Sequence, residues 1–200
     1  MKKTNSIPAK AGILIGGESQ RFGSPKWNVK IGDISVLDRL WYACSNFEKR
    51  IVIGKSKPNL MKKPFLSDET DSQGPIFGLY RLLYNSEYKW NLLLSCDLPR
   101  LRKNLLERIW IERDDKVDII LPTVNGINQV TCALYKKTLV NKINERINNQ
   151  SLSLQELVKN SRAKKVNLES WHEQLTNMNT KNDWEKIQSI EEKESLNKLS

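Results

Sequence analysis

The chain has 200 residues, and 33 Lys and Arg against 23 Asp and Glu give a formal net charge of +10 at pH 7. This length suits one compact α/β domain and is short for two. The 38% of hydrophobic residues, with six Trp, argues against a disordered chain. No run approaches the roughly 18 apolar residues of a membrane span, and residues 1–9 do not resemble a signal peptide. The charge predicts an anionic partner: nucleic acid, an acidic membrane or a phosphorylated small molecule.

Three cysteines, Cys44, Cys96 and Cys132, are isolated and odd in number. This pattern favours reduced thiols and a cytoplasmic protein over a disulfide framework or a zinc site. Cys96 is expected to be a small buried apolar residue. The single histidine, His172, is expected on the surface or in a structural role.

Apolar runs alternate with helical patterns along the chain, which predicts a three-layer α/β/α domain with a mostly parallel sheet. The predicted strands cover residues 11–15, 50–53, 90–95, 117–121, 129–135 and 164–168. Six helices are predicted. One begins at Ser35, with Asp38 in a capping box, and the next begins at Gly74-Pro75. The others surround Leu105 and Ile109, cover residues 138–149, cover residues 153–159, and run from Thr180, capped with Asp183, to about Ser189. Residues 10–189 then form the domain, residues 1–9 a flexible start, and residues 190–200 a frayed tail without a periodic apolar face.

In such sheets, ligands bind beyond the carboxyl ends of the strands. The residues that follow Ile15, Ile53 and Ser95 are therefore expected along one edge of the sheet.

A glycine-rich loop follows the first strand and reads Gly-Gly-Glu-Ser-Gln-Arg-Phe-Gly-Ser-Pro-Lys over residues 16–26. Adjacent glycines let the backbone turn sharply near a ligand, and the N–H groups of such a loop can cradle phosphate oxygens. Arg21 and Lys26 add cationic donors. The segment lacks both Gly-x-Gly-x-x-Gly and Gly-Lys-Ser/Thr, which disfavours a dinucleotide fold and a P-loop. An ordinary strand-to-helix turn is the alternative.

This loop and four further stretches resemble the molybdenum cofactor guanylyltransferases, which join GMP from GTP to molybdopterin. The four stretches, in chain order, are residues 71–78, 95–99, 128–135 and 177–183. The chain departs from the family pattern where Val130-Thr131 stands in place of Pro-Leu. Over about residues 10–188, the resemblance implies a Rossmann-like nucleotidyltransferase fold, GTP and Mo-molybdopterin as substrates, and pyrophosphate as a product.

The resemblance also implies roles for individual residues. Asp97 directly follows an apolar strand, where a carboxylate can reach a hard cation such as Mg²⁺, and the family holds its catalytic Mg²⁺ at this position. Lys26 and Arg21 would neutralise charge on the triphosphate and on the leaving pyrophosphate. The backbone amides of Leu14, Ile15, Gly16 and Gly17 would hold the nucleotide. For Asp97, the alternative is a cap of the next helix.

Two further positions carry open alternatives. Asn179, and with it Asn177, is implied as a second metal ligand or a pterin-phosphate contact; the alternative is a turn that caps the last helix. Asp71 is implied to accept the adjacent N1–H and N2–H donors of guanine, against a residue that starts the turn before Gly74.

Competing functions are a related transferase that uses CTP or a sugar phosphate, and a catalytically silent homologue that acts as an adaptor. A nucleic-acid-binding protein is disfavoured because the basic residues are scattered without a binding motif or aromatic platform, and no membrane partner is expected. Residues 49–63 contain six basic residues and no acidic one. This stretch is either a solvated face or a surface that attracts anionic substrates or an acidic partner, such as a molybdoenzyme or a cofactor-delivery protein.

Overall fold

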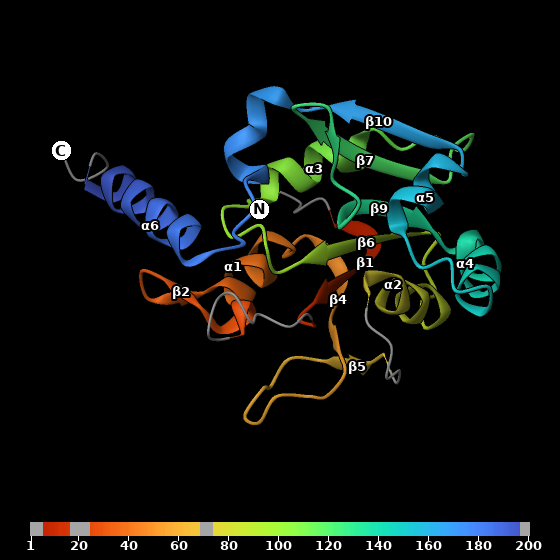
Figure 1. Ribbon diagram of the computed structural model, residues 1–200, viewed down its shortest axis with the longest axis horizontal. Coiled ribbons are helices and arrows are strands. Elements are labelled where there is room, and N and C mark those ends of the chain that lie inside the picture. The colour runs from red at the N-terminus through yellow and green to blue at the C-terminus, as the bar shows by residue number, and fades with distance from the viewer. Residues whose placement is uncertain (1–5, 17–24, 69–73, 197–200) are drawn as a thin grey trace.

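The computed structural model describes residues 6–16, 25–68 and 74–196. A twisted eight-stranded sheet runs through the molecule in the order β10-β7-β9-β6-β1-β4-β5, with β8 paired to β7 (Figure 1). Its strands are β1 (Ile7–Leu14), β4 (Phe47–Gly54), β5 (Phe65–Ser67), β6 (Trp90–Ser95), β7 (Ile119–Val124), β8 (Ile127–Asn128), β9 (Cys132–Lys136) and β10 (Ala163–Asn167). A separate two-stranded hairpin pairs β2 (Lys30–Ile31) with β3 (Ile34–Ser35).

Strand directions confirm the mostly parallel sheet. β1 runs parallel to both neighbours, with Leu14 opposite Ile53 of β4 and Ser95 of β6. β9 runs antiparallel to β6 and to β7, and β10 is again parallel to β7. Because β1, β4 and β6 end side by side, the residues that follow them meet at one edge of the sheet, as the sequence predicted.

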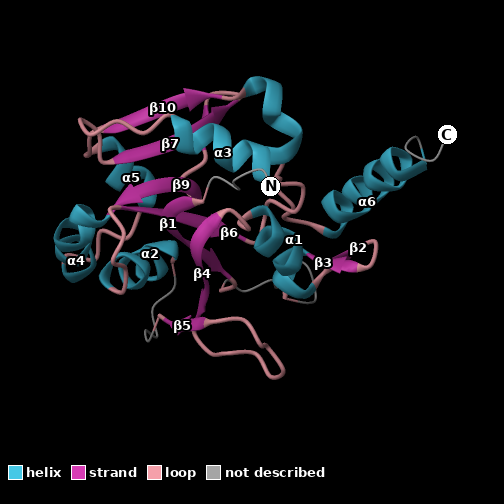
Figure 2. Ribbon diagram, turned by 180° about the vertical axis from the view of Figure 1, so that it is seen from behind, coloured by secondary structure: helices cyan, strands magenta, loops and turns pink. Residues whose placement is uncertain are grey.

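Helices cover both faces of the sheet (Figure 2). They are α1 (Val36–Ala43), α2 (Pro75–Tyr84), α3 (Lys103–Ile111), α4 (Val140–Asn148), α5 (Leu154–Lys159) and α6 (Lys181–Leu196). Leu92 and Leu94 of β6 pack in one core cluster with α1 and α3, while Leu93 packs in the other with α2, α4 and α5. Successive strand side chains point to opposite faces, so a strand buried on both sides is a continuous apolar run. The predicted three-layer architecture is confirmed.

Local signals in the sequence fix several boundaries. The Ser35 hydroxyl accepts the backbone N–H of Asp38 at 3.1 Å and caps α1, and Pro75 is the first residue of α2. Asn125 and Gly126 have φ angles of 51° and 71° and form the turn between β7 and β8.

Other boundaries differ from the prediction. Strands β2, β3 and β5 are only two or three residues long, which is too short to produce a readable alternation. The last helix was expected to end at about Ser189, but α6 continues to Leu196. Ion pairs hold this extension: Glu191 with Arg39 at 2.8 Å and Glu194 with Arg102 at 2.8 Å. The division into residues 1–9, 10–189 and 190–200 stays a prediction.

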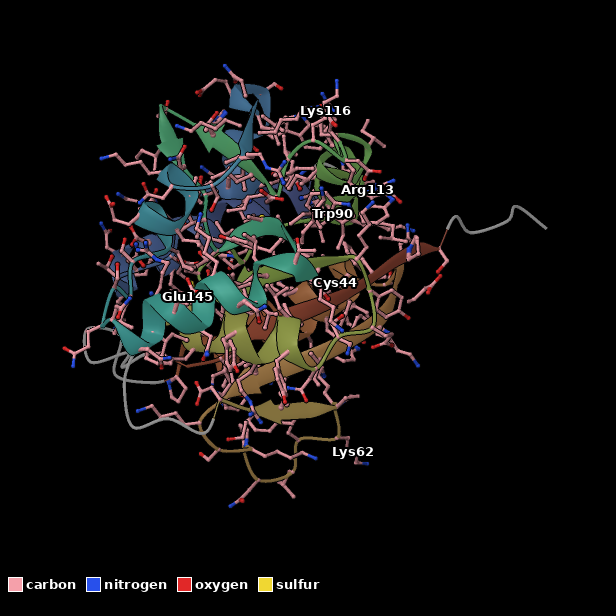
Figure 3. The ribbon with its side chains drawn as sticks, turned by 90° about the vertical axis from the view of Figure 1, so that its right-hand side faces the viewer. Cys44, Lys62, Trp90, Arg113, Lys116 and Glu145 are labelled. Carbon is pink, nitrogen blue, oxygen red and sulfur yellow. The ribbon has the colours of Figure 1, made fainter. Side chains whose placement is uncertain are left out.

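The three cysteines are free and buried. Burial raises the pKa of the Cys44 thiol to about 12, and Figure 3 shows this residue inside the body of the molecule. Cys96 is 7% exposed, and burial raises the pKa of its thiol as well. The expectation that Cys96 is a packing residue is confirmed. Among the helices that the structure describes, none combines the length and apolar character needed to cross a bilayer.

Part of the basic stretch serves packing. The guanidinium of Arg50 lies 4.5 Å from the Trp41 ring centroid, and the ammonium of Lys63 lies 5.5 Å from it. Lys63 also pairs with Asp38. The other four cations of the stretch are exposed, namely Lys49, Lys55, Lys57 and Lys62, and Figure 3 shows Lys62 on the loop that leads to β5, away from the body.

Candidate active site

Asp97 lies just beyond the carboxyl end of β6, where the apolar run of that strand stops. Its side chain is half-buried and accepts a hydrogen bond from the Ser95 hydroxyl. Its backbone carbonyl accepts the N–H of Met178 at 2.7 Å. Asp97 is therefore fixed twice, through its side chain to the sheet and through its backbone to the segment that precedes α6.

Lys26 and Asn179 meet beside Asp97. Lys26 begins a 3₁₀ helix (Lys26–Asn28) and donates from Nζ to Oδ1 of Asn179 at 2.9 Å, across 153 positions of sequence. Lys26 is also close enough to offset part of the upward shift in the Cys96 thiol pKa, which burial causes first and the Asp97 charge second. Three of the predicted site residues, Lys26, Asp97 and Asn179, thus gather at one edge of the sheet.

The turn before α6 holds Asn179 in place. Oδ2 of Asp183 accepts the backbone N–H of Asn179 at 2.9 Å and that of Thr180 at 2.8 Å. In return, the Asp183 N–H donates to the Thr180 hydroxyl at 3.2 Å. The two backbone donors hold the pKa of Asp183 below its ordinary value. The backbone of Asn179 therefore belongs to a helix cap, while its side chain points to Lys26. Asn177 is exposed in the same segment.

A series of contacts, here named the clasp, joins the segment after β1 to α6. Lys26 bonds Asn179, the Lys30 carbonyl accepts from the Trp184 indole at 2.8 Å, the Gly32 N–H donates to Gln188 at 3.3 Å, and Arg39 pairs with Glu191 at 2.8 Å. Figure 1 shows α6 beside β2.

The loop after Asp97 is also tied to α6. Arg100 is only 5% exposed and pairs with Glu191 at 3.3 Å, with Glu173 at 3.4 Å and with Glu194. Burial raises the pKa of Glu191, but Arg39 and then Arg100 outweigh that effect, so its pKa lies below the ordinary value.

Two hydroxyl groups that lie behind Asp97 were not predicted as site residues from the sequence. The Ser95 and Thr131 hydroxyl oxygens are 2.9 Å apart, and the Ser95 N–H donates to the Thr131 carbonyl at 3.0 Å. Both residues lie in stretches that carry the family resemblance, and this was the signal in the sequence that could have identified them. Their contact depends on β9 running antiparallel to β6, which the sequence pattern does not reveal.

The end of β1 carries the predicted nucleotide-binding backbone. Leu14 is its last residue, and the Ile15 N–H donates to the Ile53 carbonyl at 2.9 Å. An added Cβ on Gly78 would lie 2.3 Å from Cδ2 of Leu14, so a larger residue there would require the Leu14 side chain or α2 to shift. Gly16 is exposed with open space around it. Gly17, Arg21 and Asp71 lie outside the described residues.

The described part of the chain contains no group of three or more His, Cys, Asp or Glu that could hold a metal ion. At the site, Asp97 offers a carboxylate, Asn179 an amide oxygen and Ser95 a hydroxyl, all of them oxygen ligands. This set fits Mg²⁺, which prefers oxygen, binds through one or two carboxylates and keeps substrate phosphates in its shell. His172 is exposed, with Nδ1 3.1 Å from the Glu169 carbonyl, consistent with a surface role.

Known sequences resemble this chain over most of its length. The family model of the MobA-like NTP transferase domain matches residues 11–166. A probable molybdenum cofactor guanylyltransferase of Bacillus cytotoxicus is 25% identical over 192 residues, covering 90% of this chain and 96% of that protein. Another probable molybdenum cofactor guanylyltransferase, from Aquifex aeolicus, is 28% identical over 183 residues and covers 90% of both chains.

Solved structures share the fold. A putative protein of Aquifex aeolicus superposes with a TM-score of 0.76 at 26% identity, covering 88% of this chain and 96% of its own. The molybdopterin-guanine dinucleotide biosynthesis protein A of Archaeoglobus fulgidus superposes with a TM-score of 0.79 at 17% identity, covering 92% and 99%. The mostly parallel sheet, the family model and these relatives agree: the chain belongs to the family of MobA-like NTP transferase domains.

Proposed function

We propose that this protein transfers GMP from GTP to molybdopterin, or to Mo-molybdopterin, and releases pyrophosphate. The observation that carries the proposal is the meeting of Lys26, Asp97 and Asn179 at the carboxyl edge of the sheet. The names of the relatives from Bacillus cytotoxicus and Aquifex aeolicus support guanylyl transfer, because both match this chain over nine tenths of its length.

In this reaction, a phosphate oxygen of the pterin attacks the α-phosphorus of GTP. A new P–O bond forms there, the bond between the α-phosphorus and the bridging oxygen breaks, and pyrophosphate carries away the electron pair. Such transfers depend on positioning and charge neutralisation more than on covalent catalysis. The backbone from Leu14 to Gly17 would hold the nucleotide, and Arg21 would neutralise the leaving pyrophosphate.

Lys26 is the described cation best placed for the triphosphate. It donates to the amide oxygen of Asn179. Phosphate oxygens carry more negative charge than an amide oxygen, and charge-assisted hydrogen bonds are roughly twice as strong as neutral ones. We therefore expect Lys26 to exchange Asn179 for the triphosphate on binding.

Asp97 would hold Mg²⁺, with the Asn179 side chain as a second ligand. When bound, the ion supplies positive charge at the phosphates and orients them. The chain's own contribution is to fix the Asp97 backbone through Met178 and its carboxylate through Ser95.

Free thiols favour the cytoplasm as the compartment. The exposed lysines at positions 55, 57 and 62 are a candidate surface for a molybdoenzyme or a cofactor-delivery protein.

The test is to incubate the full chain with Mg²⁺, molybdopterin and each nucleoside triphosphate in turn, and to measure pyrophosphate release. We expect release with GTP and little with CTP. In the same assay, Asp71→Asn should lose GTP use, since the amide that replaces the carboxylate cannot accept both guanine donors. The exposed Asp115, which pairs with Lys89, provides the control variant Asp115→Asn. Equal incorporation of GTP and CTP would contradict the proposal.

A further inference from the structure

Two hydroxyl groups lie behind the Asp97 carboxylate: Ser95, which contacts it directly, and Thr131, which has no role in the proposed chemistry. We propose that Thr131 and Ser95 form a directed hydrogen-bond relay that orients Asp97, which makes them positioning residues for the metal-binding carboxylate. The inference rests on the proposed function, because that proposal assigns Asp97 to the metal.

The direction of the relay follows from counting protons. A carboxylate can only accept, and a serine hydroxyl has one hydrogen to donate. Ser95 uses that hydrogen for Oδ1 of Asp97. The second contact of Ser95, at 2.9 Å from the Thr131 hydroxyl oxygen, must then be one in which Thr131 donates. The chain of donors therefore runs from Thr131 to Ser95 to Asp97.

The sheet fixes both hydroxyls. Ser95 is the last residue of β6 and Thr131 directly precedes β9, and the register that pairs Leu94 with Cys132 places them opposite each other. Their backbones are joined by the 3.0 Å hydrogen bond from Ser95 to Thr131. A side chain on a strand, such as Ser95, is held more precisely than one on a loop, and the backbone hydrogen bond ties Thr131 to that strand, so the relay transmits the order of the sheet to Asp97.

The consequence for Asp97 is a difference between its two oxygens. Oδ1 takes the proton of Ser95, which reduces its share of the negative charge. Oδ2 is then the better donor to a cation. Thr131 stands where the family pattern has an apolar leucine, so the outer member of the relay is a property of this chain and does not follow from the resemblance.

The experiment compares Thr131→Val, which keeps the side-chain shape and removes the donor, with Thr131→Ser, which keeps the donor. Ser95→Ala removes the inner member. Thr123→Val is the matched control, because Thr123 is half-buried on β7 and its hydroxyl donates to the Val166 carbonyl at 3.4 Å. Mn²⁺ binding is measured by electron paramagnetic resonance with a GTP analogue that carries a methylene between the α- and β-phosphorus atoms. Thermal unfolding of each variant is measured in parallel.

We expect Thr131→Val and Ser95→Ala to weaken Mn²⁺ binding about tenfold, the usual effect of removing a hydrogen-bond partner of a metal ligand. Thr131→Ser and Thr123→Val should bind as the wild type does. If the wild type binds Mn²⁺ and both relay variants match it, the relay is wrong while the proposed function stands. An equal loss in Thr131→Ser and Thr131→Val also overturns the relay, since the hydroxyl is then not the cause. Absence of nucleotide-dependent Mn²⁺ binding in the wild type overturns the metal assignment of Asp97 and the relay with it.

Discussion

Asp97 and Asn179 lie side by side at one edge of the sheet, but the molecule holds them by different means. On the strand-held side, Asp97 depends on Ser95 and Thr131, through hydrogen bonds in which the Asp97 carboxylate is the one charged group. On the helix-held side, Asn179 depends on the Asp183 cap and on α6, which ion pairs fasten to Arg39 and Arg100.

The two halves of the site respond differently to solution conditions. The strand-held contacts named above contain one charged group, Asp97, whereas the helix-held side depends on ion pairs, and ion pairs between partly exposed groups are screened by salt. The helix-held side is therefore the half that salt or a single charge substitution can loosen while Asp97 stays in place.

The largest effect is expected from Asp97→Asn on the strand-held side. Loss of the carboxylate removes the negative charge that would hold the metal, and we expect kcat for pyrophosphate release to fall about a thousandfold. The hydrogen bond from Ser95 can still form to the amide oxygen, so thermal stability should change little. Asp115→Asn is the control, and comparable activity of both variants would remove Asp97 from the chemistry.

Gly78→Ala perturbs the packing of the strand-held side. The added Cβ would meet Cδ2 of Leu14 at 2.3 Å and lie 3.4 Å from a methyl group of Ile53, so the Leu14 side chain or α2 must shift. Overpacking of this kind costs up to about 3 kcal/mol of unfolding free energy, measurable by urea denaturation. Gly16→Ala introduces the same methyl group into open space, and its stability should equal that of the wild type. Equal stability of both variants would show that the packing at Gly78 is not tight.

Arg100→Met tests the helix-held side. Arg100 is 5% exposed and pairs with three carboxylates, so its removal takes a buried cation away from Glu173, Glu191 and Glu194. We expect a loss of about 2 kcal/mol in unfolding free energy. Hydrogen exchange should rise in α6 and remain slow in β6 and β9.

The control for this change is Arg102→Met, because Arg102 pairs with the same Glu194 but its side chain is 51% exposed. An exposed ion pair contributes about 0.5 kcal/mol or less. Similar losses in both variants would mean that burial of Arg100 adds nothing.

Asp183→Asn gives the smallest effect and a distinctive pH profile. The pKa of Asp183 is lowered by the backbone donors of Asn179 and Thr180, so its charge stabilises the fold above the ordinary aspartate pKa of about 3.9 and that contribution disappears as the pH falls through the lowered value. The variant should be about 1 kcal/mol less stable at pH 7 and approach the wild type once the pH lies below the lowered pKa of Asp183. Asp33→Asn, in the turn between β2 and β3, is the control. A difference that persists unchanged at low pH would contradict this account.

Much of the fold could be predicted because its signals are local. The β6 strand from Trp90 to Ser95, the caps at Ser35 and Asp183, and the Asn125-Gly126 turn each depend on a few neighbouring residues. The placement of Asp97 follows from the same logic, since it directly follows a buried strand.

What escaped prediction depends on contacts far apart in sequence. Ser95 meets Thr131 only because β9 reverses direction. The second half of α6 lacks an apolar stripe, and Glu191 and Glu194 hold it by ion pairs that a hydropathy pattern does not register. The burial of Arg100 has the same origin, because its acidic partners lie more than 70 positions away.

The clasp affects the entropy that the chain loses when distant segments come together during folding. The first of its contacts to form joins residues about 150 positions apart, such as Lys26 and Asn179, and the entropy lost in closing a loop grows only with the logarithm of its length. Once one contact exists, each neighbouring contact closes a further loop of only about ten residues or fewer, from Lys30–Trp184 to Arg39–Glu191. The contacts of the clasp therefore form and break together, and Asn179 is brought beside Asp97 in a single cooperative step.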